Sequence, residues 1–105
     1  MISPSPTRAG VTERVRSVEP QIRALGVRRL ALFGSVVRGD ARPDSDIDLL
    51  VEFRPGEKSA ARFFALYDLL EETLGGRVEL VTTEALSPFI GPHILAEAAD
   101  IVLAA

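Results

Sequence analysis

Two short apolar runs, at residues 28–34 and 46–53, most constrain what this chain can fold into. The first run is apolar on both alternating faces and ends at Gly34, which is typical of a central strand in a sheet. The second run keeps one face apolar, whereas its opposite face begins with Asp46 and Asp48. We therefore predict two strands, and the second should pack one face while the start of its other face opens onto something polar.

A helical pattern and a third strand follow these two runs. Apolar residues recur at three- and four-residue steps across residues 60–74, with Ser59 in the N-cap position and Gly75 as the stop. Residues 77–83 then alternate as a strand, and Glu79 interrupts one of its apolar faces. We expect the helix to cover the sheet that the strands form.

The two ends of the chain carry further, shorter patterns. Residues 11–25 have the apolar spacing of an amphipathic helix that Pro20 kinks or splits, and residues 1–10 are expected to be a disordered tail. The segment 89–105 predicts a short helix and then an edge strand at 101–103. Its apolar side chains either complete the core or form a partner surface, and the sequence leaves both open.

Length and composition limit the class of protein. With 105 residues, the chain has the size of one domain, and we expect a single α/β domain over residues 11–105. A formal net charge of −3 argues against direct nucleic-acid binding, which normally uses a basic face. The absence of cysteine from the sequence excludes disulfides and thiolate zinc sites and fits a cytoplasmic protein. Neither an export signal nor an apolar run long enough for a membrane span is present in the sequence.

Three acidic residues are the candidates for chemistry. Asp46 and Asp48 lie two positions apart on one strand face, so they are roughly 6.5 Å apart along the strand. Glu79 interrupts the next predicted strand. If the three carboxylates converge, they form an oxygen-only site, which suits magnesium better than zinc. Magnesium would then supply the counter-charge that partly buried carboxylates need.

The turn at Gly34 and Ser35 offers a complementary site for an anion. A short helix that begins at Ser35 would present free backbone N–H groups, and Gly34 would let an anion approach the backbone closely. Arg38 and Arg42 follow in the loop. Each arginine either neutralises phosphate oxygens or is an ordinary exposed loop charge. Together with the carboxylates, these residues predict a site for a metal-bound nucleotide.

The combined pattern resembles the signature of the minimal nucleotidyltransferases in the DNA polymerase β-like superfamily. The likeness is carried by Gly34-Ser35, ten further residues and Asp46-Ile47-Asp48, together with Arg38-Gly39 and the strings SDIDLLVEF and EALSP. It extends over about residues 25–103. The resemblance implies a small mixed β-sheet flanked by helices that holds ATP and magnesium.

The resemblance also implies roles for individual residues. Gly34 and Ser35 would contact the nucleotide phosphates, Asp46 and Asp48 would ligate and bridge the metal ions, and Glu79 would be the third catalytic carboxylate. The family more often has aspartate at the position of Glu79. The extra methylene predicts a displaced carboxylate and a slower reaction.

These roles lead to three hypotheses about function. The first is an enzyme that transfers AMP from Mg-ATP to a hydroxyl, foremost that of a tyrosine, on a HEPN-domain toxin, and that acts as the antitoxin. The second is a catalytically weak nucleotide-binding module that neutralises the toxin by forming a complex, and Glu79 motivates it. The third is transfer to a small molecule such as an aminoglycoside, for which a partner or a homo-oligomer would have to complete the site.

Overall fold

The structure, a computed structural model, describes residues 5–102 of the chain. Its strands are β1 (Val27–Phe33), β2 (Ile47–Phe53), β3 (Val78–Thr82) and β4 (Ala99–Val102). Its helices are α1 (Arg8–Ser17), α2 (Glu19–Ala24), α3 (Ser35–Arg38), α4 (Ala60–Leu74), the 3-10 turn η1 (Thr83–Ala85) and α5 (Gly91–Glu97). None of the helices in this part of the chain is long and apolar enough to cross a membrane.

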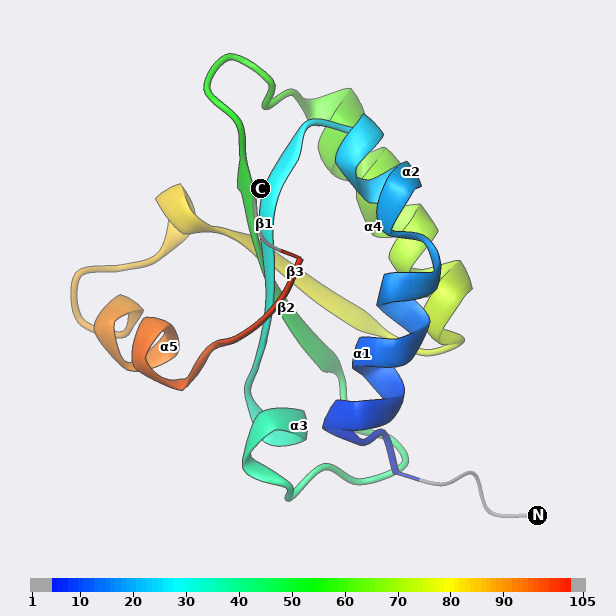
Figure 1. Ribbon diagram of the computed structural model, residues 1–105. Helices are drawn as coiled ribbons and strands as arrows, with labels where there is room; N and C mark the ends of the chain where they lie inside the picture. Colours follow the sequence, from blue (N-terminus) through cyan, green and yellow to red (C-terminus); the bar gives the residue numbers. More distant parts are fainter. Residues whose placement is uncertain (1–4, 103–105) are drawn as a thin grey trace.

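The four strands form one mixed sheet in the order β3-β2-β1-β4 (Figure 1). Strand β1 runs antiparallel to both of its neighbours, whereas β2 and β3 are parallel. A parallel pair needs a crossover connection, and α4 supplies it between β2 and β3. The predicted mixed sheet with flanking helices is confirmed, as is the interior position of β1.

The main core lies between the sheet and the helices α1, α2 and α4, which cover one of its faces (Figure 1). Leu32 and Leu49, directly opposite each other on β1 and β2, are fully buried there. Leu66 and Leu70 of α4 pack onto them from the helix layer. Burial of one such side chain contributes roughly 1.5–3 kcal/mol, so this face supplies most of the hydrophobic stabilisation.

The opposite face of the sheet carries a smaller apolar cluster. Ala31, Phe33 and Leu50 are buried there, and Ile94 and Ala98, from α5 and the residue after it, pack against them. Because α5 covers only part of this face, the start of β2 and of β3 is left open beside the cluster (Figure 1). The candidate carboxylates lie at that open end.

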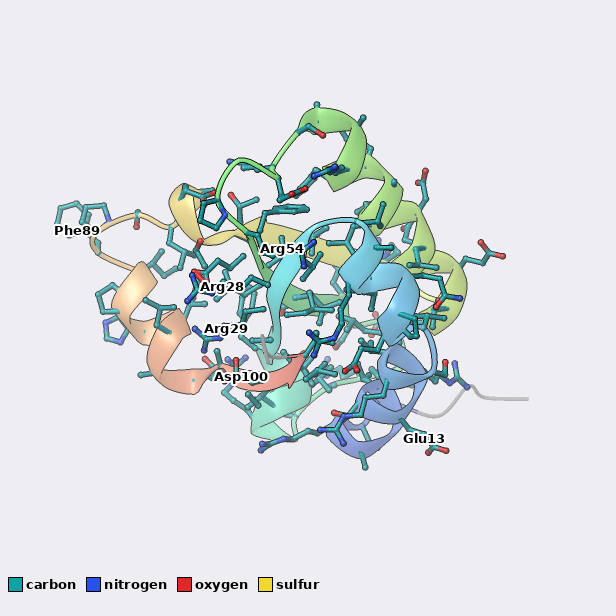
Figure 2. The ribbon with its side chains drawn as sticks, turned by 45° about the horizontal axis from the view of Figure 1, so that its top comes forward. Glu13, Arg28, Arg29, Arg54, Phe89 and Asp100 are labelled. Atoms are coloured by element: carbon teal, nitrogen blue, oxygen red, sulfur yellow. The ribbon has the colours of Figure 1, made fainter. Side chains whose placement is uncertain are left out.

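The sequence left open whether the apolar side chains of the last segment complete the core or form a partner surface. In the structure, some of them are buried in the core and others are exposed. Ile101 is buried in the core, whereas Ile90 is exposed and Phe89 is 87% exposed (Figure 2). The predicted edge strand is present, but it begins earlier, at Ala99. Leu103, its predicted last residue, lies outside the described residues.

The N-terminal segment differs from its prediction in one respect. Helix α1 begins at Arg8, where Thr7 accepts a hydrogen bond from the Gly10 amide at 3.1 Å, so the predicted tail of residues 1–10 is too long by at least three residues. Residues 1–4 lie outside the described part. The predicted break near Pro20 is confirmed: Val18 separates α1 from α2, and Pro20 occupies the first turn of α2, where its missing N–H does no harm.

Candidate active site

The parallel pairing of β2 and β3 brings two of the predicted carboxylates together. Asp48 lies directly opposite Glu79 in the register of the two strands. Both side chains are on the sheet face that α1 and α4 do not cover, because their neighbours Leu49 and Val78 point into the main core. Asp48 is half-buried and Glu79 is exposed. The structure therefore forms an acidic pair at the open end of the sheet.

The electrostatics of this pair are unusual. The pKa of Asp48 is raised to about 6, first because the side chain is partly buried and then because of the negative charge and the hydrogen bond of Glu79. The charge of Asp46 adds a smaller increase, and Arg38 opposes it. A carboxylate in this state lacks a sufficient counter-charge. The pair therefore favours the arrival of a proton or of a cation.

Asp46 is held differently from the other two acidic residues. Its Oδ1 forms an ion pair with Nε of Arg77 at 3.1 Å, and Arg77 also donates from Nη2 to the Asp44 carbonyl at 3.2 Å. Within residues 5–102, no three acidic or imidazole side chains are arranged to ligate one metal ion together. Oxygen donors are nevertheless the set that magnesium prefers. Asp48 and Glu79 place donors of this kind side by side, whereas the Asp46 carboxylate is paired with Arg77 in this structure.

Sequence reasoning missed Arg77. The residue immediately precedes β3, and its carbonyl accepts a hydrogen bond from the Ile47 amide at 2.9 Å. This bond places Arg77 beside the residue that precedes β2, which is Asp46. The opposite charges at the starts of two apolar strands were visible in the sequence, but only the parallel register makes them neighbours.

Gly34 forms the wall of the site beside Asp48. It ends β1 with φ +78° and leads directly into α3, as predicted. A Cβ atom built on Gly34 would lie 2.0 Å from Oδ2 of Asp48. Only glycine combines this backbone conformation with so close an approach. Ser35, the first residue of α3, follows it and is half-buried.

The two candidate arginines have different surroundings. Arg38, on α3, forms ion pairs with Asp40 and Glu97 and is close enough to Asp48 to lower its pKa. Arg42 is exposed, and its amide donates to Oγ of Ser45 at 2.8 Å, which closes the loop before β2. Arg38 therefore lies near the acidic pair, whereas the main-chain contact of Arg42 shapes the loop.

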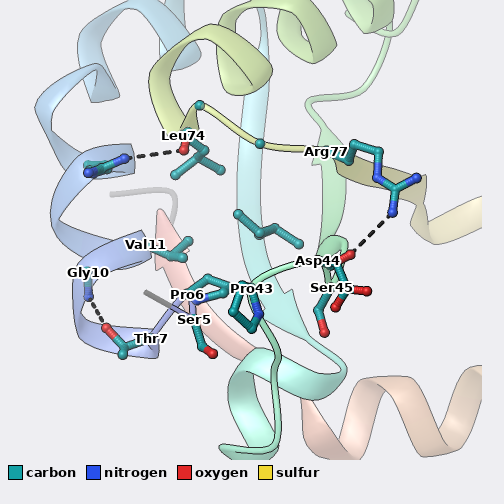
Figure 3. Close-up of a pocket in the computed structure, with 14 residues that line it drawn as sticks. Ser5, Pro6, Thr7, Gly10, Val11, Pro43, Asp44, Ser45, Leu74 and Arg77 are labelled. Carbon is teal, nitrogen blue, oxygen red and sulfur yellow. Dashed lines mark hydrogen bonds between the residues drawn. The ribbon is translucent and has the colours of Figure 1, made fainter. Parts of the chain in front are cut away.

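A cavity of about 640 Å³ lies on the other side of the start of β2 (Figure 3). It is enclosed by the N-terminal turn of α1, the end of α4 and the loop before β2. Ser45 and Ile47, on either side of Asp46, line this cavity, but Asp48 and Glu79 do not. This cavity and the Asp48–Glu79 pair are therefore separate, although Arg77, the ion-pair partner of Asp46, lines the cavity.

Comparisons with known proteins identify the family of this chain. Residues 15–101 match the family model described as a nucleotidyltransferase domain. The protein adenylyltransferase MntA of Thermococcus cleftensis is 44% identical over 72 residues, which are 69% of this chain and 72% of that protein. A Methanocaldococcus jannaschii protein assigned as a protein adenylyltransferase is 38% identical over 92 residues, covering 88% of this chain and 98% of its own.

Solved structures show the same fold. One that is assigned to the minimal nucleotidyltransferases is 36% identical and has a TM-score of 0.77, covering 89% of this chain and 94% of its own. A second solved structure is a complex of a tri-AMPylated HEPN toxin with an MNT antitoxin, from Shewanella oneidensis. The matched chain of this complex is 17% identical and has a TM-score of 0.63, and the match covers 89% of this chain and 72% of that chain. The family model and the sequence of the Methanocaldococcus jannaschii relative both match most of the chain, and the chain belongs to the nucleotidyltransferase domain family.

Proposed function

We propose that this protein is a protein adenylyltransferase that transfers AMP from Mg-ATP to a hydroxyl of a HEPN-type toxin and thereby acts as its antitoxin. The observation that carries the proposal is the Asp48–Glu79 pair, in which Asp48 lies against the backbone of Gly34. The activity named for the Thermococcus cleftensis relative supports it. The Shewanella oneidensis complex of a tri-AMPylated toxin with its antitoxin supports the choice of partner.

In the proposed reaction, the acceptor hydroxyl oxygen attacks the α-phosphorus of ATP. A new P–O bond forms, the bond to the β-phosphate breaks, and pyrophosphate leaves. The proton of the hydroxyl passes to Glu79, which is exposed and therefore accessible to an acceptor protein. Gly34, Ser35 and Arg38 bind and orient the phosphates. Asp46, Asp48 and Glu79 would hold magnesium, which when bound supplies charge neutralisation and lowers the pKa of the acceptor hydroxyl.

The cytoplasm is the compartment we propose, because the reaction consumes ATP and the sequence contains no cysteine that would call for an oxidising environment. The acceptor most consistent with the proposal is tyrosine. A tyrosine side chain is long enough to bring its oxygen to a site at the end of a sheet while the rest of the acceptor stays at the surface.

The test is the intact mass of the partner protein after incubation with this protein, ATP and magnesium. We expect an increase by one or more AMP units. Asp48→Asn removes the central carboxylate and should abolish the increase, whereas Glu13→Gln, on the exposed side of α1, should not (Figure 2). An unmodified partner, or full modification by Asp48→Asn, would contradict the proposal.

A second function is favoured by one residue, Glu79, where the family more often has aspartate. A longer side chain displaces its carboxylate and slows transfer. In that case the protein would neutralise the toxin by binding it. The outcome that identifies this function is a stable complex with an unmodified partner, and Glu79→Asp would then be expected to gain transfer activity.

A further inference from the structure

The end of α5 touches the candidate nucleotide site through one ion pair. Nη1 of Arg38 donates to Oε1 of Glu97 at 2.8 Å, and Nε of Arg38 faces Oδ2 of Asp40 at 3.4 Å. The Glu97 side chain is 25% exposed, compared with 63% for Asp40. Glu97 is therefore the closer and the better shielded of the two partners, and it comes from a distant part of the chain.

The sheet explains why Glu97 lies there. Strand β4 pairs with β1, and Ala99 is opposite Leu32. Strand β1 continues through Gly34 into α3, so Glu97, which ends α5 two residues before the start of β4, comes to lie beside α3. The position of Glu97 is thus fixed by the backbone pairing of two strands and by the packing of Ile94 on the small apolar cluster.

The ion pairs of Arg38 leave some of its N–H donors free to bind a ligand. The guanidinium has five N–H donors, and its contacts with Asp40 and Glu97 use Nε and one hydrogen of Nη1. Within residues 5–102, Nη2 donates no hydrogen bond. A planar guanidinium that is held at two of its nitrogens presents its remaining donors in a constant orientation, which suits a phosphate group.

We propose that Glu97 is a positioning residue that holds Arg38 in the orientation in which its free donors bind the phosphates of ATP. The inference rests on the proposed function, because it takes the Arg38 side of the site to be where the triphosphate binds. Glu97 does not touch the nucleotide. It acts by reducing the number of orientations that Arg38 samples before ATP arrives, so less conformational entropy is lost on binding.

The test is a double-mutant cycle on the affinity for the magnesium complex of α,β-methylene-ATP, measured by titration calorimetry with no acceptor present. The four proteins are the parent, Glu97→Gln, Arg38→Gln and the double variant. Glu97→Gln should weaken binding roughly two- to fivefold, the range of one partly exposed ion pair. In the Arg38→Gln background, the same change should have no further effect.

A control separates positioning from simple stabilisation. Glu84→Gln breaks the ion pair of Glu84 with Lys58, whose N–O distance is 3.0 Å, and should leave the affinity unchanged. If Glu97 only fastens α5 to the domain, Glu97→Gln will lower Tm without changing the affinity, and that result overturns the proposal. An equal loss of affinity with and without Arg38 overturns it as well.

The cycle also distinguishes this proposal from the proposed function. If the cycle shows coupling but the partner gains no AMP, transfer is refuted and the positioning role stands. If the partner is modified but Glu97 and Arg38 are uncoupled, the positioning role is refuted alone. A parent protein that binds no nucleotide refutes both.

Discussion

At the scale of single residues, the approach of Gly34 to Asp48 is the tightest constraint in the site. A Cβ on Gly34 would come within 2.0 Å of a carboxylate oxygen, well inside van der Waals contact. Asp48 is the residue whose pKa the surroundings shift to about 6. One backbone position thus controls where the central acidic group of the site lies.

Gly34→Ala is expected to reduce AMP transfer by about a hundredfold or more, because a displacement of the carboxylate near 1 Å has an effect of that order. The measurement is the rate of AMP incorporation into the partner. Gly56→Ala is the matched control: Gly56 also has φ +78°, but nothing lies within 4 Å of its Cβ position. If both variants lose activity equally, the contact with Asp48 has no special role.

At the scale of elements, strands β2 and β3 are held together against the repulsion of their own carboxylates. Asp48 and Glu79 are directly opposite each other in a parallel ladder. The backbone hydrogen bonds and the buried neighbours of these residues offset the repulsion. We expect that relief of this repulsion will stabilise the protein in the absence of magnesium.

Asp48→Asn is expected to raise the free energy of unfolding at pH 7 by about 1 kcal/mol, a value reduced for partial exposure. In the folded protein, the pKa of Asp48 is raised from 3.8 to about 6, so the folded state binds the proton more tightly than the unfolded state does. The parent therefore loses stability as the pH rises from about 4 to 6 and then levels off. The gain of Asp48→Asn should disappear below pH 4.

Thermal unfolding at a series of pH values between 3 and 8 measures this effect, and a change of about 1 kcal/mol corresponds to roughly 4–8 °C in Tm for a domain of this size. Glu13→Gln, on an exposed face of α1, serves as the control. If Asp48→Asn is less stable than the parent at pH 7, favourable contacts of the Asp48 carboxylate outweigh its repulsion by Glu79, and the prediction is wrong.

The elements themselves were largely predictable, because their signals are local. Ser59 caps α4 by accepting a hydrogen bond from the Arg62 amide, and Gly75 ends it in the left-handed conformation, both as expected. The start of α1 was placed too late because the cap at Thr7 was overlooked. A single threonine among prolines and serines is a weak signal beside the composition of a tail.

The site was predictable only in part, for a physical reason. Gly34 and Asp48 belong to a short pattern in one stretch of sequence, so a shared site was expected, although their close contact is visible only in the structure. The ion pairs of Asp46 with Arg77 and of Arg38 with Glu97 join segments whose proximity depends on strand order and register. Charge alone offers many such pairings, and only the fold selects among them.

At the scale of the whole molecule, stability is concentrated on the helix-covered face of the sheet. Leu32→Ala is expected to lower the free energy of unfolding by about 2–5 kcal/mol, because Leu32 is fully buried and the lost volume leaves a cavity. Phe89→Ala should change it by less than about 0.5 kcal/mol, since Phe89 is almost fully exposed. Urea unfolding of both variants measures the difference, and equal effects would contradict this division.

The pairing of β1 with β4 has a consequence for the order of events during synthesis. Arg29 and Asp100, whose side chains form an ion pair across these strands, are 71 residues apart in the chain (Figure 2). While the polypeptide emerges from the ribosome, one edge of β1 therefore stays unpaired until β4, the last described strand, has been synthesised. Glu97 emerges just before that strand. The growing chain can form its acidic pair once β3 is made, before β4, and it completes both the sheet edge and the support of Arg38 together, as translation of the described residues ends.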